Sequence, residues 1–177
     1  LPHRIRRPFP NPMTRFPFPC RVALRLAALA LAFCAGATPA APRTLMVYGD
    51  SLSAAYGLAT GEGWVALLGE RIARDRLDWR VVNASVSGET TAGGLRRLPG
   101  DLKRHQPSLV VIALGANDGL RGQPVPAMRD NLREMIRLVR AARAEPVLVG
   151  LLLPPNYGIE YAREFRELYP QLAQEAK

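Results

Sequence analysis

From residue 42 onward, two hydrophobic patterns take turns along the chain. Short apolar runs, typical of strands, alternate with longer segments in which apolar residues recur at helical spacing. The pattern predicts strands at residues 44–48, 79–83, 109–114 and 146–153. It predicts helices at 64–73, 95–105, 125–144 and 161–176, the last kinked or restarted at Pro170. Such alternation indicates right-handed βαβ units and a parallel sheet.

The fourth predicted strand, residues 146–153, is very apolar for the edge of a sheet. An edge strand exposes N–H and C=O groups that can pair with another chain. We therefore expect a fifth strand that this sequence does not contain, and an α/β domain over residues 42–177 that is incomplete at its C-terminal end.

Residues 1–41 are organised differently from the rest. Met13 is followed by three arginines, an apolar run over residues 26–35 and small residues as far as Ala41. This order is typical of a signal peptide, and the run is too short to cross about 30 Å of hydrocarbon. We expect residues 1–12 to be an over-long start, cleavage to fall within residues 37–41, and the mature protein to be periplasmic or secreted.

The net charge of +9 comes largely from this leader. Residues 1–41 hold six arginines and no acid, so 18 basic and 15 acidic residues remain, a net of +3. The remaining charges scatter along predicted helices, which favours solvated faces over a nucleic-acid footprint. Both cysteines, Cys20 and Cys34, lie in the leader, so no disulfide is expected beyond it. An uncleaved anchor and a lipid on Cys34 are the disfavoured alternatives, the second because bulky Phe33 precedes the cysteine.

Three loops that follow predicted strands carry side chains suited to acyl transfer: residues 49–53, 83–90 and 115–119. In open parallel sheets, sites lie beyond the carboxyl ends of the strands, near the switch in strand order. Ser51 lies at a strand-to-helix turn and could act as a nucleophile. The Ser51 and Gly88 backbone N–H groups and the Asn117 side-chain amide could donate to the oxyanion that develops on the substrate.

The other polar residues of these loops have structural interpretations. We expect Asp50 to bond to the backbone of its own loop, and Asp118 to order its own turn. Asn83 either supports the Ser51 loop or forms an Asx-turn at the strand end. The remaining residues of the second loop are expected to be small or solvated: Ser85, Ser87 and Glu89.

The segments GDSLSAAYGL, VVNASVSGETTAGGLRRLP, ALGANDGLRG and LLLPPNYG resemble the successive blocks of the SGNH (GDSL-type) hydrolases. The resemblance runs from Thr44 to the chain end and is closest to the periplasmic acyl-CoA thioesterase, lysophospholipase and arylesterase group of Gram-negative bacteria. It implies a flavodoxin-like three-layer α/β/α sandwich of strand order 2-1-3-4-5, of which this chain holds 2-1-3-4. It also implies hydrolysis of carboxylic esters or thioesters through an acyl-serine at Ser51, with Gly88 and Asn117 completing the oxyanion hole.

The resemblance further implies an Asp-x-x-His block that supplies the acid and the general base, and the chain reaches Lys177 without it. His105 ends a predicted helix that runs back toward the amino ends of the strands, so we expect it on the surface, opposite Ser51. A serine without a base is a poor nucleophile. We therefore expect activity near background, and the alternative function is a non-catalytic acyl- or acylated-glycan-binding protein of the same fold.

The expected substrate is a small acyl ester or thioester, and the resemblance implies that residues 119–124 line its acyl groove. Leu120 and Tyr157 are candidate substrate-binding residues, although packing over the sheet end accounts for Tyr157 equally well. An acyl-serine mechanism needs no cofactor, and no Cys or His pair has metal-ligand spacing. We expect neither nucleic-acid binding nor stable membrane insertion, and the oligomeric state and preferred acyl length stay open. A flavin carrier is disfavoured because the first loop lacks a serine- and threonine-rich phosphate cradle.

Overall fold

The structure is a computed structural model that describes residues 41–176. The predicted leader therefore lies outside the described residues, apart from Ala41. Within the described range, no helix has the length and apolar character needed to cross a membrane. The elements in chain order are β1 (Arg43–Gly49), α2 (Trp64–Arg74), β2 (Trp79–Asn83), α3 (Thr91–His105), β3 (Leu109–Ala113), α4 (Ala116–Leu120), α5 (Val125–Ala141), β4 (Glu145–Leu148), the 3-10 helix η1 (Pro155–Tyr157) and α6 (Ile159–Glu175).

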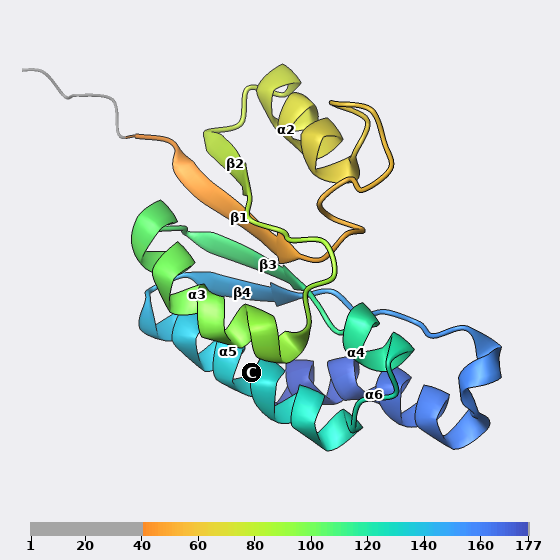
Figure 1. Ribbon diagram of the computed structural model, residues 1–177. Coiled ribbons are helices and arrows are strands. Elements are labelled where there is room, and N and C mark those ends of the chain that lie inside the picture. Colours follow the sequence, from red (N-terminus) through yellow and green to blue (C-terminus); the bar gives the residue numbers. More distant parts are fainter. Residues whose placement is uncertain (1–40, 177) are drawn as a thin grey trace, which may run out of the picture. The chain divides into compact units, whose positions relative to one another are not determined.

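The four strands form one parallel sheet of order β2-β1-β3-β4, which confirms the predicted fold class and strand order (Figure 1). Val47 of β1 lies opposite Asn83 of β2 and Val111 of β3, so the three strands end close together. The chain order jumps from one side of β1 to the other between β2 and β3. The switch point expected of a ligand site therefore lies at the carboxyl ends of β1, β2 and β3.

Helices cover the sheet in two layers (Figure 1). Helix α2 packs against β2 on one side, and α3, α5 and α6 pack together on the other. On the second side, strand residues that point the same way, such as Met46, Tyr48 and Ile112, are fully buried. Helix α5 meets them with the stripe Leu132, Met135, Ile136 and Val139, whose helical spacing was visible in the sequence.

Helix α3 begins at Thr91, four residues before the predicted start at residue 95. The Gly93-Gly94 pair suggested a break there, but both glycines lie inside the helix. A Cβ on Gly94 would lie 2.6 Å from Leu114 Cδ1, so glycine lets α3 approach the sheet closely. The helix can start early because Thr90 caps it, its Oγ1 accepting a hydrogen bond from Gly93 N at 3.1 Å.

Near the C-terminus, the predicted end of the fourth strand is wrong, and of the two alternatives for Pro170, a kink or a restart, the restart is wrong. Strand β4 ends at Leu148 rather than at residue 153, because its only neighbour among the described strands, β3, ends at Ala113 and leaves later residues without a pairing partner. Helix α6 continues through Pro170 as one helix and does not restart there. Burial of Phe165 and Leu172, before and after the proline, stabilises both halves against the same core.

Candidate active site

The first site loop, residues 49–53, is held in a tight turn by Asp50. The Asp50 carbonyl accepts hydrogen bonds from Ser53 N at 3.1 Å and Ala54 N at 2.8 Å, and its carboxylate Oδ1 accepts one from Leu52 N at 3.0 Å. The prediction that Asp50 fixes its own loop is confirmed. Its carboxyl is buried, and this burial raises its pKa, partly opposed by the Leu52 N–H bond. Ser51 is half-buried and lies within the turn that these bonds define.

Asn83, the last residue of β2, fulfils both of its predicted alternatives. Its Nδ2 donates to Ser53 O at 2.7 Å, which supports the Ser51 loop, and its Oδ1 accepts from Ser85 N at 3.1 Å, which forms the Asx-turn. Ser85 does more than the small loop residue that was expected, because its Oγ accepts a hydrogen bond from Gly49 N at 3.0 Å. The first two loops are therefore tied together at Gly49, two residues before Ser51.

Asn117 joins the third loop to the other two. The segment 116–120, predicted as a loop, forms the short helix α4 and places Asn117 in its first turn. Asn117 Nδ2 lies 2.9 Å from Glu89 O and 3.4 Å from Asp50 Oδ2. The amide therefore sits between the loop that carries Gly88 and the residue next to Ser51, so the three predicted loops do meet.

Gly88 is exposed and has a φ of +79°, a backbone conformation that favours glycine. Among residues 41–176, apart from the two chain neighbours, no atom lies within 4 Å of a Cβ built there, so the backbone conformation rather than space selects glycine. The Gly88 carbonyl lies 3.4 Å from Arg121 Nη2. Gly88 thus lies on an exposed turn, one residue before the carbonyl that accepts from the Asn117 amide.

Asp118 was expected to order its own turn, and its carboxylate instead binds the start of α3. The carboxylate is buried and accepts hydrogen bonds from Thr91 N at 2.8 Å and Thr91 Oγ1 at 2.6 Å. Asn131 of α5 donates to the same Thr91 hydroxyl at 3.0 Å. This buried network fixes α4, and with it Asn117, relative to α3.

Glu89 was expected to be solvated, and its side chain is only 14% exposed. Its Oε2 pairs with Arg97 Nε at 3.1 Å, and its Oε1 accepts from Thr90 N at 3.3 Å. The sequence hinted at neither contact, because an acid in a glycine-rich loop usually faces water. Glu89, which follows Gly88 and whose carbonyl accepts from Asn117, is therefore anchored to α3.

His105 lies at the last position of α3, at the end remote from the site loops. Three residues later, Ser108 N donates to Thr44 O near the start of β1, at 2.8 Å. The expected placement of His105 at the opposite pole from Ser51 is confirmed. It is the sole histidine of residues 41–176, so within this range no imidazole lies near Ser51.

Comparison with known proteins decides which class of enzyme this geometry belongs to. The model of the GDSL-like Lipase/Acylhydrolase family matches residues 47–177. The chain belongs to this family. Esterase TesA of Pseudomonas aeruginosa is 52% identical over 138 residues, which are 78% of this chain and 69% of the relative. Thioesterase 1/protease 1/lysophospholipase L1 of Escherichia coli is 46% identical over 140 residues, 77% of this chain and 64% of the relative.

A solved structure agrees with these sequence relatives. The crystal structure of TesA has a TM-score of 0.74 and 51% identity, over 76% of this chain and 74% of that chain. The comparisons confirm the predicted family and the predicted enzyme class, a serine hydrolase of ester and thioester bonds. The roles assigned to individual residues are not tested by them and stay predictions.

The two candidate substrate-binding residues of this chain, Leu120 and Tyr157, lie side by side. Leu120, at the end of α4, is 49% exposed, and its carbonyl accepts a hydrogen bond from Tyr157 Oη at 3.3 Å. A pocket of about 420 Å³ lies between α6 and the segment after β4, and neither candidate residue lines it. It is lined by Leu152, Leu153, Ile159, Ala162, Arg163 and Arg166.

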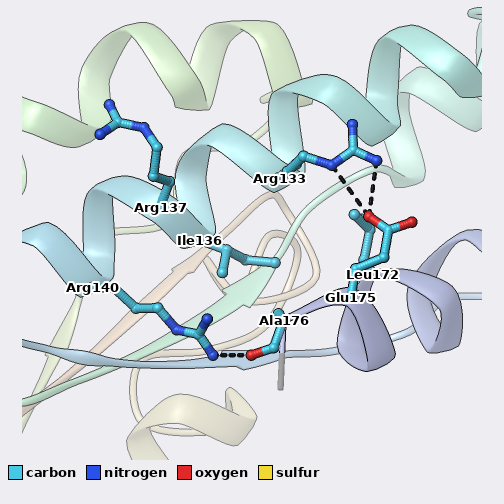
Figure 2. A pocket seen from close by; sticks show the side chains of 7 residues that line it. All are labelled: Arg133, Ile136, Arg137, Arg140, Leu172, Glu175 and Ala176. Carbon is cyan, nitrogen blue, oxygen red and sulfur yellow. Dashed lines mark hydrogen bonds and ion pairs between the residues drawn. The ribbon is translucent and has the colours of Figure 1, made fainter.

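A separate pocket between α5 and α6, of about 240 Å³, does not belong to this site (Figure 2). Its arginines are engaged within the protein: Arg133 pairs with Glu175 at 2.8 Å, and Arg140 donates to the Ala176 carbonyl. None of the three site loops contributes to its lining. Over residues 41–176, no cluster of three or more His, Cys, Asp or Glu side chains could hold a metal ion.

Proposed function

We propose that this chain hydrolyses small carboxylic esters or thioesters through an acyl-serine intermediate on Ser51. The Ser51 and Gly88 backbone N–H groups and the Asn117 amide would receive the oxyanion. The observation that carries the proposal is the position of the Asn117 amide, 2.9 Å from the carbonyl after Gly88 and 3.4 Å from the carboxylate before Ser51. An amide held between a serine and a glycine turn offers neutral donors where negative charge develops.

The proposed reaction has two steps. Ser51 Oγ forms a bond to the substrate carbonyl carbon and loses its proton, and the bond to the alcohol or thiol leaving group then breaks as that group takes up a proton. Water attacks the acyl-serine in the second step, which releases the carboxylic acid and restores the serine. In both steps negative charge passes through the carbonyl oxygen, so the same three donors would serve twice.

The first test is hydrolysis of p-nitrophenyl acetate and butyrate by the 177-residue chain and by Ser51→Ala. We expect hydrolysis that depends on Ser51 but is slow, because within residues 41–176 the one histidine lies at the far end of α3. Serine proteases that lack a triad member keep about 10³–10⁴-fold catalysis over water from the oxyanion hole and binding alone, so only the part of the rate that Ser51→Ala removes reports the acyl-serine step. Equal rates for the parent chain and Ser51→Ala would contradict the proposal. Fast turnover that Ser51→Ala abolishes would show that another group supplies the base.

A second candidate function is an acyl- or acylated-glycan-binding protein that does not hydrolyse its ligand. The position of His105 favours it, because this histidine lies too far from Ser51 to serve as its base. A fluorophosphonate probe separates the two candidates, because it attaches covalently to an activated serine. Since no imidazole lies near Ser51 within residues 41–176, the hydrolase predicts slow labelling, an added probe mass that grows with time and is absent in Ser51→Ala. The binding protein predicts no added mass, together with saturable binding of a short-chain fatty acid.

We propose that Leu120 and Tyr157 contact the acyl group of the substrate. Leu120 presents an exposed apolar side chain next to the site helix α4, and Tyr157 is bonded to it through the main chain. Leu120→Ala should raise KM for the butyrate ester several-fold more than for the acetate ester, since a lost apolar contact is worth about 1–3 kcal/mol. The exposed Leu77, on the loop before β2, gives the matched control Leu77→Ala.

We also propose that residues 1–41 are a cleaved export signal and residues 42–177 the hydrolase domain, so that the enzyme acts in the periplasm or outside the cell. The support is the order of basic, apolar and small residues in the sequence. Mass spectrometry of the protein recovered from a periplasmic extract should give a new amino terminus within residues 38–42. Recovery of the uncut chain in the cytosol would contradict this proposal.

A further inference from the structure

Glu89 connects two of the proposed oxyanion donors. It follows Gly88 directly, and its carbonyl accepts the hydrogen bond from Asn117 Nδ2 at 2.9 Å. A shift of the Glu89 backbone would therefore move the Gly88 turn and the Asn117 amide together. The Gly88 turn itself is exposed, and it is held by the hydrogen bond from Glu89 N to Val86 O at 3.1 Å and by a long contact of 3.4 Å from Arg121 Nη2 to Gly88 O.

The side chain of Glu89 is held by Arg97, two helical turns into α3. Arg97 Nε donates to Glu89 Oε2 at 3.1 Å, and the two side chains are 28% and 14% exposed. An ion pair this sheltered is screened less by water than one on the open surface. The Glu89 carboxylate also accepts from Thr90 N at 3.3 Å, which fixes the carboxylate against the start of α3.

Arg97 is held rigidly on its other sides. Its Nη1 pairs with Asp101 at 2.5 Å, and its guanidinium lies 4.4 Å from the centroid of the Tyr48 ring. Tyr48 is fully buried and donates to Gly94 O at 2.8 Å, so the ring is fixed as well. A planar guanidinium can stack on this ring and bind two carboxylates at once, which a lysine ammonium cannot do.

One atom of Arg97 is left in an unfavourable state. Its Nη2 is buried and has no hydrogen-bond partner among the described residues. A buried donor without a partner costs free energy, so an arginine is a poor choice here for stability alone. The other atoms of the guanidinium contact Glu89, Asp101 and the Tyr48 ring, so Arg97 joins the Glu89 loop to both the helix and the sheet.

We propose that Arg97 and Glu89 are positioning residues that hold the Gly88 turn and the Asn117 amide in place for the proposed ester hydrolysis. Neither touches the substrate. Arg97 fixes the Glu89 carboxylate, and the Glu89 backbone in turn fixes both donors. The inference rests on the proposed function only for its effect on rate, because the geometric link exists whether or not the chain turns over.

The test compares Arg97→Met, Arg97→Lys and Glu89→Gln with a matched control, Arg104→Met. Arg104 lies on the same helix and pairs with the same Asp101, but it does not reach Glu89. Amide NMR on ¹⁵N-labelled chain would follow the Asn117 side-chain N–H pair and the Gly88 N–H. We expect both signals to move in Arg97→Met and Glu89→Gln, to move less in Arg97→Lys, and to stay in place in Arg104→Met.

Kinetics with p-nitrophenyl butyrate gives the second readout. Removing an oxyanion donor costs about 10²–10³-fold in kcat, so displacing donors should cost about tenfold, with KM nearly unchanged. Arg97→Lys should recover part of that loss. Unmoved Gly88 and Asn117 signals in a folded Arg97→Met would overturn the positioning role. If Arg97→Met fails to fold, Glu89→Gln, which keeps the side-chain shape, decides by the same signals.

The two proposals fail in different ways. Absence of Ser51-dependent hydrolysis in the parent chain would remove the proposed function and leave the NMR result to decide on Arg97. Ser51-dependent hydrolysis with an unchanged kcat in Arg97→Met and Glu89→Gln would keep the function and overturn the positioning of its donors.

Discussion

At the residue scale, the amide of Asn117 has two N–H bonds and two different neighbours. One N–H is engaged by Glu89 O at 2.9 Å, whereas Asp50 Oδ2, at 3.4 Å, is a distant acceptor for the other. The engaged bond fixes the plane of the amide, and the loosely held one can turn to a stronger acceptor. A substrate oxyanion is such an acceptor, and an uncharged donor stabilises it without first having to be desolvated as an ion.

Asn117→Ala should therefore lower kcat by about 10²–10³-fold and change KM little. The measurement is the Ser51-dependent initial rate with p-nitrophenyl butyrate over a range of concentrations. Asn156→Ala, at an exposed asparagine beside Tyr157, is the control for a lost amide elsewhere on the surface. A KM that rises while kcat stays constant would show that Asn117 binds the ground state instead.

Asp50 gives a pH-dependent prediction with a definite sign. Burial raises the pKa of its carboxyl above the ordinary 3.8, so the folded chain keeps this proton to a higher pH than the unfolded chain does. Stability is therefore lost as the pH rises from near 3.8 through the folded pKa, and the penalty is absent below that window. Asp50→Asn should gain stability over the parent above the window and show no such gain at about pH 3. Urea unfolding across this pH range checks the sign, with Asp78→Asn, at an exposed aspartate, as control.

The site could be predicted only as far as local residues and strand order determine it. Ser51, Gly88 and Asn117 lie in the loops that follow predicted strands, and a parallel sheet brings such loops to one edge. The contacts that hold them could not be predicted in this way. The hydrogen bond from Gly49 N to Ser85 Oγ spans 36 residues and the one from Thr91 to Asp118 spans 27, and neither leaves a periodic trace in the sequence.

At the scale of elements, the start of α3 depends on a side chain from another helix. The first N–H groups of a helix have no partner within it, and here the Asp118 carboxylate accepts from Thr91 N and from the Thr91 hydroxyl. A negative charge at this end also complements the helix dipole. The same contact locks α4 to α3, so one carboxylate serves two elements.

Asp118→Asn should lower the free energy of unfolding by about 2 kcal/mol, because an amide oxygen cannot satisfy both Thr91 donors as the charged carboxylate does. Urea unfolding with an unchanged m-value is the measurement. Asp130→Asn is the control, since Asp130 forms an exposed pair with Arg133 on α5 and should cost less than about 1 kcal/mol. A loss for Asp118→Asn no larger than for the control would mean that α3 begins without this cap.

Strongly patterned elements were predicted nearly residue for residue, and the errors fall where another part of the fold intervenes. Strand β2 and the start of α5 agree with the sequence pattern, because their apolar spacing is unambiguous. Helix α4 was missed because five residues of turn-forming composition carry no periodicity. Helix α5 ends three residues early, with Arg143 at a φ of +62°, a stop that its apolar spacing does not reveal.

At the scale of the whole domain, the two sides of the sheet are covered unequally. Three helices bury one side, whereas among the described elements only α2 packs on the other, against β2. On that second side, Val147 of β4 is 39% exposed, and β4 pairs with a neighbour along one edge alone among the described strands. Apolar side chains beside open backbone groups favour strand-to-strand association between molecules.

We therefore expect the 177-residue chain to self-associate as its concentration rises, through β4. Val147→Lys should reduce the association, because a charge on an edge strand disfavours pairing with a second chain, while Val147 is exposed enough that the fold should tolerate the change. Light scattering over a concentration series measures this. Leu77→Lys, which adds the same charge at a 53% exposed leucine on a loop, controls for net charge. Reduced association in Val147→Lys alone would place the contact between chains at the edge of the sheet. Equal reduction in both variants would indicate general charge repulsion. Reduction in neither variant would mean that the contact between chains lies elsewhere.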